Sequence, residues 1–389
     1  MINLDHNATT PLDARVRSAM VDVLSREGLG NPSSTHALGR ATRDLVEAAR
    51  RAVAAAVDAE ALGVTFVSGG TEADNLAIVG GARSLRARGL PCGVATTRLE
   101  HPAVAAAAAA LEAEGVPVVW VPVDEQGTLS AEQLASLVRT HPEVGLVSIA
   151  AANHELGNVY PIEAIAAAVK AERGEVLVHC DAVQAFGKRP VSFGAWGVDL
   201  LSLSSHKIYG PAGVGALVHH THTKLAPLSF GGSQERGRRV GTENWMAVHG
   251  FGVAATLAAE AAQGHAEQLR PWRDRIAEAV LDAGGRVHGA PGLGNTLNFG
   301  FEGAPGELMC MNFDLEGIAL STGAACSAGS LEPSKVILAL GQPAERAAEA
   351  VRISMGRDTT EEDVQMLIER LPTIVGRVRK AHGTLENAP

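Results

Sequence analysis

The chain has 389 residues, 46% of them hydrophobic and 20% charged. This length predicts two domains with a large core, and the composition excludes a disordered chain. The formal net charge of −10 and the four cysteines argue against a nucleic-acid face, a polybasic membrane surface and a disulfide scaffold. Since we find no signal peptide and no apolar run long enough to cross a bilayer, we expect a cytoplasmic enzyme.

Short apolar, β-prone runs alternate with alanine-rich helical stretches over the first 220 residues. The alternation predicts an α/β fold whose large domain holds a mostly parallel, seven-stranded sheet covered by helices. The expected strands are Gly63–Val67, Val94–Thr97, Val118–Val121, Gly145–Ala150, Val176–Cys180, Leu200–Leu203 and Gly215–Val218. The expected helices are Asp74–Arg88, Pro102–Glu114, Ser130–Thr140 and Ile162–Glu172.

The pattern changes after residue 250 and predicts a smaller α+β C-terminal domain. We expect the large domain to span 13–260, and the small domain to comprise 1–12 and 261–389. The expected elements of the second part are a helical stretch from Phe251 to Ala283 interrupted near Pro271, a strand at Asn295–Phe301, a Gly/Ser/Ala-rich loop at Ser321–Ser330 and a helix at Thr360–Ala381.

A lysine and an aspartate lie at the carboxyl ends of two predicted strands, the edge where open α/β sheets bind ligands. Lys207 follows the apolar run Val198–Leu203, and Asp181 follows Val176–Cys180, with Gln184 three residues on. A partly desolvated lysine can form a Schiff base, and a buried acid can keep a pyridine nitrogen protonated. The alternative interpretations are a surface lysine and a helix N-cap.

The segment from Ser68 to Asp74 follows a predicted strand and opens a helix. Its glycines, its free N–H groups and the hydroxyl of Thr71 are suited to a phosphate, although an ordinary loop is the alternative. His101 also follows a strand, and can stack on a ring or shuttle protons unless it is structural. A metal site is not expected, because the clustered His219, His220 and His222 lack an acidic or cysteine partner.

Cys326 and Arg352 are two further candidates in the C-terminal part. Cys326 lies among small residues and glycines, which predicts an exposed loop and makes its thiol a candidate nucleophile. Arg352 interrupts a strand-like segment and is suited to bind a carboxylate, a salt bridge being the alternative.

Together these segments resemble the class V, fold-type I pyridoxal-phosphate enzymes, and among them the NifS/IscS-like cysteine desulfurases. The resemblance covers nearly the whole chain and rests on an ordered set of motifs. They are Leu4 to Pro11, Gly30 to His36, Gly69 to Asn75, Glu100-His101, Asp181 to Gln184, Ser204 to Lys207, Arg239 to Thr242, Gly323 to Cys326, Leu331 to Ser334, and Arg352.

The resemblance implies a role for each candidate. Lys207 would carry the cofactor covalently and move the substrate's α-proton, His101 would stack on the ring, and Cys326 would accept sulfur. Asp181 would bind the pyridine nitrogen, and Gln184 would bind the ring hydroxyl. The phosphate would be held by Gly70, Thr71, Ser204 and His206, and by Thr242 from the second subunit of a homodimer. The substrate carboxylate would be bound by Asn31 and Arg352.

One position departs from the family pattern. In the stretch from Ala152 to Gly157, His154 stands where the family has the second Asn of Asn-Asn-Glu-x-Gly, close to the ring hydroxyl. Histidine can also donate a hydrogen bond, but its charge changes near neutral pH. We therefore include His154 among the cofactor-binding residues and expect a shifted pH dependence.

The activity that the resemblance implies is cysteine desulfuration. L-Cysteine would give L-alanine and a persulfide on Cys326, which would pass to an acceptor protein such as an iron–sulfur scaffold. The alternatives are a selenocysteine lyase, another class V aminotransferase or lyase, and a non-catalytic sulfur-relay subunit.

Overall fold

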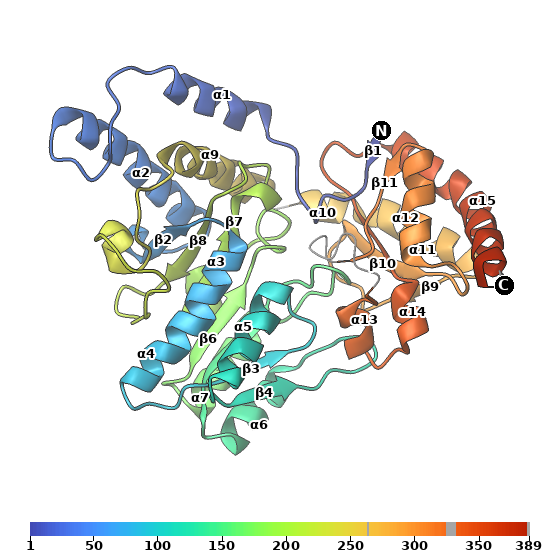
Figure 1. The fold of residues 1–389 in the computed structure, drawn as a ribbon, viewed down its shortest axis with the longest axis horizontal. Coiled ribbons are helices and arrows are strands. Elements are labelled where there is room, and N and C mark those ends of the chain that lie inside the picture. The colour runs from blue at the N-terminus through green and yellow to red at the C-terminus, as the bar shows by residue number, and fades with distance from the viewer. Residues whose placement is uncertain (263, 324–331, 387–389) are drawn as a thin grey trace.

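The computed structural model describes residues 1–262, 264–323 and 332–386. Figure 1 shows a larger part built on a central sheet and a smaller part that holds both ends of the chain. The central sheet has seven strands in the order β2-β8-β7-β6-β5-β3-β4, and only β8 is antiparallel to its neighbours. The strands are β2 (Val64–Val67), β3 (Gly93–Thr97), β4 (Val118–Val121), β5 (Val144–Ala150), β6 (Leu177–Asp181), β7 (Leu200–Ser204) and β8 (Gly215–His219).

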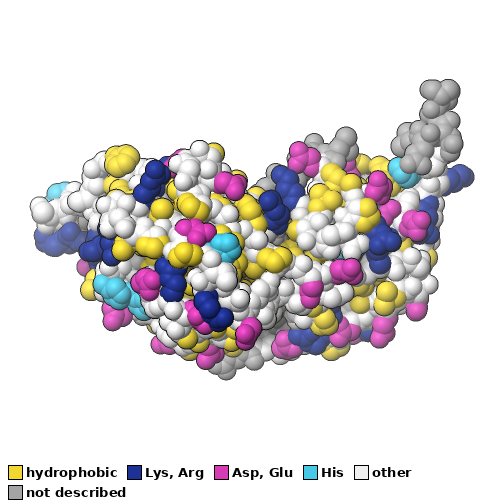
Figure 2. Space-filling model, turned by 90° about the horizontal axis from the view of Figure 1, so that it is seen from below, with side chains coloured by type: hydrophobic (Ala, Val, Ile, Leu, Met, Phe, Trp, Pro, Cys, Tyr) yellow, Lys and Arg dark blue, Asp and Glu magenta, His cyan; other side chains and the backbone are white. Residues whose placement is uncertain are grey.

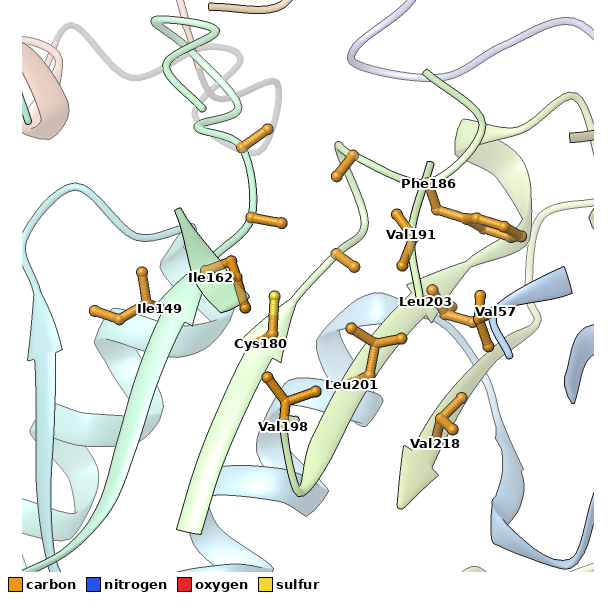
Figure 3. Close-up of a cluster of buried hydrophobic side chains, with 14 of the residues drawn as sticks. Val57, Ile149, Ile162, Cys180, Phe186, Val191, Val198, Leu201, Leu203 and Val218 are labelled. Atoms are coloured by element: carbon orange, nitrogen blue, oxygen red, sulfur yellow. The ribbon is translucent and has the colours of Figure 1, made fainter. Parts of the chain in front are cut away.

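Helices cover both faces of this sheet, because successive side chains of a strand point to opposite faces and most strands are buried at every position. Leu200 of β7 packs with one buried cluster, whereas Leu201 and Leu203 pack with another on the opposite face. Figure 3 shows Cys180 and Leu201 in the second cluster. The helices of this part are α1 (Ala14–Leu24), α2 (Ala37–Ala56), α3 (Gly70–Asn75), a π-helical segment at Leu76–Gly80, α4 (Gly81–Ala87), α5 (Pro102–Ala113), α6 (Ala131–Thr140), α7 (Ile162–Glu172), α8 (Phe193–Trp196) and α9 (Trp245–Ala261).

The smaller part contains two further sheets. The antiparallel order is β12-β10-β9, and β1 pairs in parallel with β11, so the first residues of the chain pack on its C-terminal part. The strands are β1 (Ile2–Asn3), β9 (Arg286–His288), β10 (Thr296–Gly300), β11 (Ile318–Ala319) and β12 (Val351–Ser354). The helices are α10 (His265–Gln268), α11 (Arg270–Asp282), α12 (Gly306–Leu315), α13 (Lys335–Ala339), α14 (Ala344–Ala348) and α15 (Glu361–Glu386).

The predicted fold class is confirmed, and each of the seven expected strands forms within two residues of its predicted bounds. The helix expected from Phe251 instead begins at Trp245, because the Asn244 side chain caps it by accepting from the Ala247 N–H. Neither α1 nor α2 was predicted. The division into domains at residues 12/13 and 260/261 stays a prediction. Val336 and Ile337 of α13, which this division places in the small domain, pack with the hydrophobic cluster of the large sheet.

The surface carries charges of both signs. On the face shown in Figure 2, Lys and Arg side chains are interspersed with Asp and Glu rather than joined into one basic patch. Within the described part of the chain, none of the helices combines the length and the apolar character that crossing a membrane requires.

Candidate active site

The carboxyl ends of β2, β3, β5, β6 and β7 meet at one edge of the central sheet, because these strands run in the same direction. A cavity of about 160 Å³ lies at this edge. Ten of the predicted site residues line it: Gly70, Thr71, His101, His154, Asp181, Gln184, Ser204, His206, Lys207 and Arg352. The sequence motifs therefore converge on one site.

Lys207 is held by the N-terminal segment of the chain. It ends a 3-10 turn that follows β7, and its Nζ donates to the carbonyl oxygens of Asn7 and Ala8, the latter at 2.8 Å. Two residues later the backbone of Tyr209 adopts a left-handed φ of 63°, a strained conformation for a non-glycine residue. Its N–H donates to Thr10 Oγ1 at 2.7 Å, which fixes the turn that presents the lysine.

Asn7 also joins several other groups of the site. Its carbonyl accepts a hydrogen bond from Gln184 Nε2 at 3.0 Å, and its Oδ1 accepts one from Lys188 Nζ at 2.6 Å. Lys188 also donates to Gln184 Oε1 at 2.5 Å. Burial, with the nearby charges of Lys207 and Arg352, lowers the pKa of Lys188 well below its usual range. Gln184 is thus oriented by partners on both sides of its amide.

Two other buried acids, Asp74 and Glu100, lie near Asp181. Its Oδ1 accepts the Val183 N–H at 2.9 Å, and burial raises its pKa. Burial and the charge of Asp181 raise the pKa of Glu100 to about 8, and they also raise the pKa of Asp74. A pKa of about 8 leaves Glu100 mostly protonated at neutral pH, so this carboxyl adds little negative charge beside Asp181.

His101 and His154 form one wall of the cavity, with ring centroids 5.1 Å apart and planes at 71°. Burial, followed by the charges of His154, Lys207 and Arg352, lowers the pKa of His101 to about 3, so its ring is neutral at neutral pH. Its Nδ1 accepts the Ala103 N–H at 3.1 Å, and the proton of the neutral ring must therefore be on Nε2. His101 is a hydrogen-bond donor toward the cavity.

The opposite end of the cavity fits a phosphate. A Cβ atom on Gly70 would lie 2.9 Å from Val183 Cγ2, so only glycine leaves this approach open. The buried Ser204 Oγ has no hydrogen-bond partner among the described residues. Thr71 is exposed, and His206 Nδ1 lies 3.1 Å from Thr9 Oγ1. The Ser204 hydroxyl lacks a partner, and Gly70 exposes the backbone at the start of α3. Both can therefore donate hydrogen bonds to a phosphate.

Arg352 reaches the cavity from the other sheet. It lies in β12 and is 2% exposed; its guanidinium donates to Asp5 Oδ1 at 2.7 Å and to the His154 carbonyl at 2.9 Å. Its Nε has no partner within the described chain. These contacts keep a buried cation beside the cavity with donor capacity left for a carboxylate.

Three predicted residues are not brought to this cavity by the described chain. Asn31 is exposed in the loop between α1 and α2, where its Oδ1 accepts the Ser33 N–H at 2.9 Å. Thr242 is exposed and lies outside the cavity of its own chain. Cys326 lies outside the described residues. The roles assigned to these three stay predictions.

Several residues of the site were missed by sequence reasoning. Asn7 and Asp5 lie in the motif from Leu4 to Pro11. The sequence indicates no role for them, because their partners lie in distant parts of the chain. Glu100 stands beside His101, and its burial was the missing signal. Lys188 lies four residues after Gln184 in a non-helical turn, so no local pattern in the sequence indicates that their side chains meet.

The geometry agrees with comparisons to known proteins. Residues 2–367 match the family described as aminotransferase class-V. The chain is 40% identical to "Cysteine desulfurase IscS" of Dictyoglomus turgidum over 97% of this chain and 95% of that protein. Among solved structures, a "NIFS-like protein" superposes with a TM-score of 0.88 and 33% identity, covering 97% of this chain and 99% of the other.

A further structure, titled "SspA in complex with cysteine", matches with a TM-score of 0.78 and 30% identity, covering 91% of this chain and 99% of that one. The chain belongs to the class V aminotransferase family. Within that family its relatives are cysteine desulfurases of the NifS and IscS type, which confirms the resemblance drawn from the sequence motifs.

Proposed function

We propose that the protein is a pyridoxal-phosphate-dependent cysteine desulfurase. The observation that supports this most is the convergence of Lys207, Asp181, His101 and Arg352 on one cavity. Pyridoxal phosphate fits the groups present: a lysine, a buried acid and an open glycine cradle with an unpartnered hydroxyl. When bound, it supplies an electron sink for the electron pair left at the substrate's Cα.

The residues of the chain have separate tasks in this reaction. Arg352 binds the carboxylate of L-cysteine, and the amine of Lys207 takes the Cα proton. The neutral His101 donates from Nε2 and stacks along the wall of the cavity. Asp181 keeps its charge toward the ring nitrogen, while His154 and Gln184 face the ring hydroxyl. Ser204, His206, Gly70 and Thr71 hold the phosphate.

Cys326 is the proposed sulfur acceptor. Its thiolate forms an S–S bond with the sulfur of the substrate as the Cβ–S bond breaks, and Cβ takes a proton to give L-alanine. The transferred sulfur is oxidised to the persulfide level, and Cβ is reduced. Two other thiols are poor candidates: burial raises the pKa of Cys310 to about 12 and that of Cys180 well above its usual range.

Further parts of the proposal concern partners. The persulfide passes to an acceptor protein such as an iron–sulfur scaffold, in the cytoplasm. The enzyme is a homodimer in which Thr242 reaches the phosphate of the partner's site. The exposure of Thr242, which lies outside the cavity of its own chain, supports this. Asn31 assists Arg352 at the substrate carboxylate.

The test is Cys326→Ser. We expect the variant to bind pyridoxal phosphate with an unchanged visible spectrum, while alanine release from L-cysteine falls by about 100-fold or more. Mass spectrometry of the wild type after brief exposure to L-cysteine should find one added sulfur on Cys326. Normal turnover by the variant would overturn the assignment of the nucleophile, and keto acid formation in place of alanine would indicate an aminotransferase.

A further inference from the structure

Glu155 is buried, with 3% of its surface exposed, but it does not line the cavity. It follows His154 in a tight turn after β5. Asn153 Oδ1 accepts the N–H groups of Glu155 and Leu156 at 2.9 and 2.8 Å, and Asn153 Nδ2 donates to the Leu99 carbonyl at 2.7 Å. These bonds fix the turn, so the direction of the Glu155 side chain is set by the same backbone that presents His154 to the cavity.

The carboxylate of Glu155 contacts two residues that are close in sequence to Cys326, one on each side. Ser334 Oγ donates to its Oε2 at 2.6 Å. Gly323 lies against it so closely that a Cβ atom there would be 2.6 Å from Oε2, and the φ of Gly323 is +121°. One buried side chain therefore contacts both positions, position 334 through a hydrogen bond and position 323 through close packing.

The charge of Glu155 is retained despite its burial. Burial raises the pKa of Glu155, but the nearby His154 ring, the hydrogen bond from Ser334 and the charge of Arg352 outweigh burial, and the pKa of Glu155 is lowered. His154 Nε2 lies 3.6 Å from its Oε1. A buried carboxylate is costly unless it is paired, and these partners offset that cost.

We propose that Glu155 is a positioning residue that fixes both ends of the stretch carrying Cys326 to the turn that forms the wall of the cavity. The inference rests on the proposed role of Cys326. It assigns Glu155 no contact with substrate or cofactor. Its function is to keep the thiol's attachment points at a set distance from the substrate, since a shift of about 1 Å can lower a rate by about 100-fold.

The test compares Glu155→Ala with Glu155→Gln in the holoenzyme. Glu155→Ala should slow persulfide formation on Cys326 in a single turnover by about 100-fold. KM for L-cysteine and the visible spectrum of the cofactor should change little, because Arg352, Lys207 and Asp181 keep their contacts. Glu155→Gln retains an oxygen that accepts from Ser334 and should recover most of the rate. In enzyme without substrate, iodoacetamide should alkylate Cys326 faster in Glu155→Ala than in the wild type.

A double-mutant cycle separates positioning from general destabilisation. Ser334→Ala should slow the same step, and the double variant with Glu155→Ala should be no slower than Glu155→Ala alone. Because Ser334 also caps α13, Ser130→Ala, which removes a similar cap from α6, is the matched control and should leave the rate unchanged. Wild-type persulfide formation in Glu155→Ala, or additive effects in the cycle, would overturn the inference. A wild-type enzyme that forms no persulfide would instead refute the proposed function.

Discussion

The two sheets contribute to the site in different ways. The seven-stranded sheet supplies groups from the ends of its strands, where Asp181 ends β6, and Lys207 and His101 follow β7 and β3. The three-stranded sheet supplies Arg352 from within β12, with its guanidinium braced by Asp5 and the His154 carbonyl. In the proposed function, the first arrangement binds the cofactor, and the second places beside it the cation that would bind the substrate carboxylate. Changes in the two sheets should therefore have separable effects.

The largest expected effect comes from Arg352→Lys. Lysine cannot reproduce the forked contacts of the guanidinium, so KM for L-cysteine should rise by about 100-fold. The visible spectrum of the cofactor should not change, because its groups belong to the other sheet. Arg286→Lys, in the same small sheet but paired with Glu349 outside the cavity, is the control and should keep KM. An altered cofactor spectrum with a normal KM for L-cysteine would contradict the assignment of cofactor binding to the large sheet and substrate binding to the small one.

Glu100→Gln tests the edge of the large sheet. The pKa of Glu100 is raised from 4.5 to about 8, so the folded protein keeps a proton that the unfolded chain loses. Between these two pH values the unfolded state binds fewer protons, and stability falls as pH rises, by at most about 1.4 kcal/mol per pH unit. The variant cannot titrate, and its Tm should fall less steeply from pH 5 to 8.

The control for this slope is Glu112→Gln, which changes an exposed carboxyl on α5. It should leave the Tm profile of the wild type intact. If the Tm of Glu100→Gln fell with pH as steeply as that of the wild type, Glu100 would not be protonated in the folded protein.

The smallest effect is expected at Thr296, where the small sheet meets the N-terminal segment. Its Oγ1 accepts from Asn7 Nδ2 at 3.0 Å and donates to Asn295 Oδ1 at 3.1 Å. Thr296→Val removes both bonds and should lower the free energy of unfolding by about 1 kcal/mol, measured by urea denaturation. Thr296→Ser keeps the hydroxyl and should lose less. A larger loss in Thr296→Ser than in Thr296→Val would show that the methyl group, and not the hydrogen bonds, stabilises this junction.

The sequence was sufficient to predict the large sheet and most of the cavity. Parallel strands place their carboxyl ends together, so residues such as Asp181 and Lys207 could be assigned to one edge from their positions after strands. The ordered motifs added Arg352, whose position beside that edge depends on the packing of two sheets and does not follow from local pattern. The support around these groups was not predictable, because Asn7, Glu100 and Glu155 act through contacts that depend on burial and distant partners.

The role of Asn7 has a consequence for how the chain is made. Its N–H donates to Ser354 Oγ at 2.9 Å across 347 positions, and its side chain meets Thr296 across 289. During synthesis Asn7 leaves the ribosome 347 residues before Ser354. A nascent chain can form the large sheet before the segment that holds Lys207 is braced, so the enzyme should become competent to retain its cofactor only after Ser354 has been synthesised.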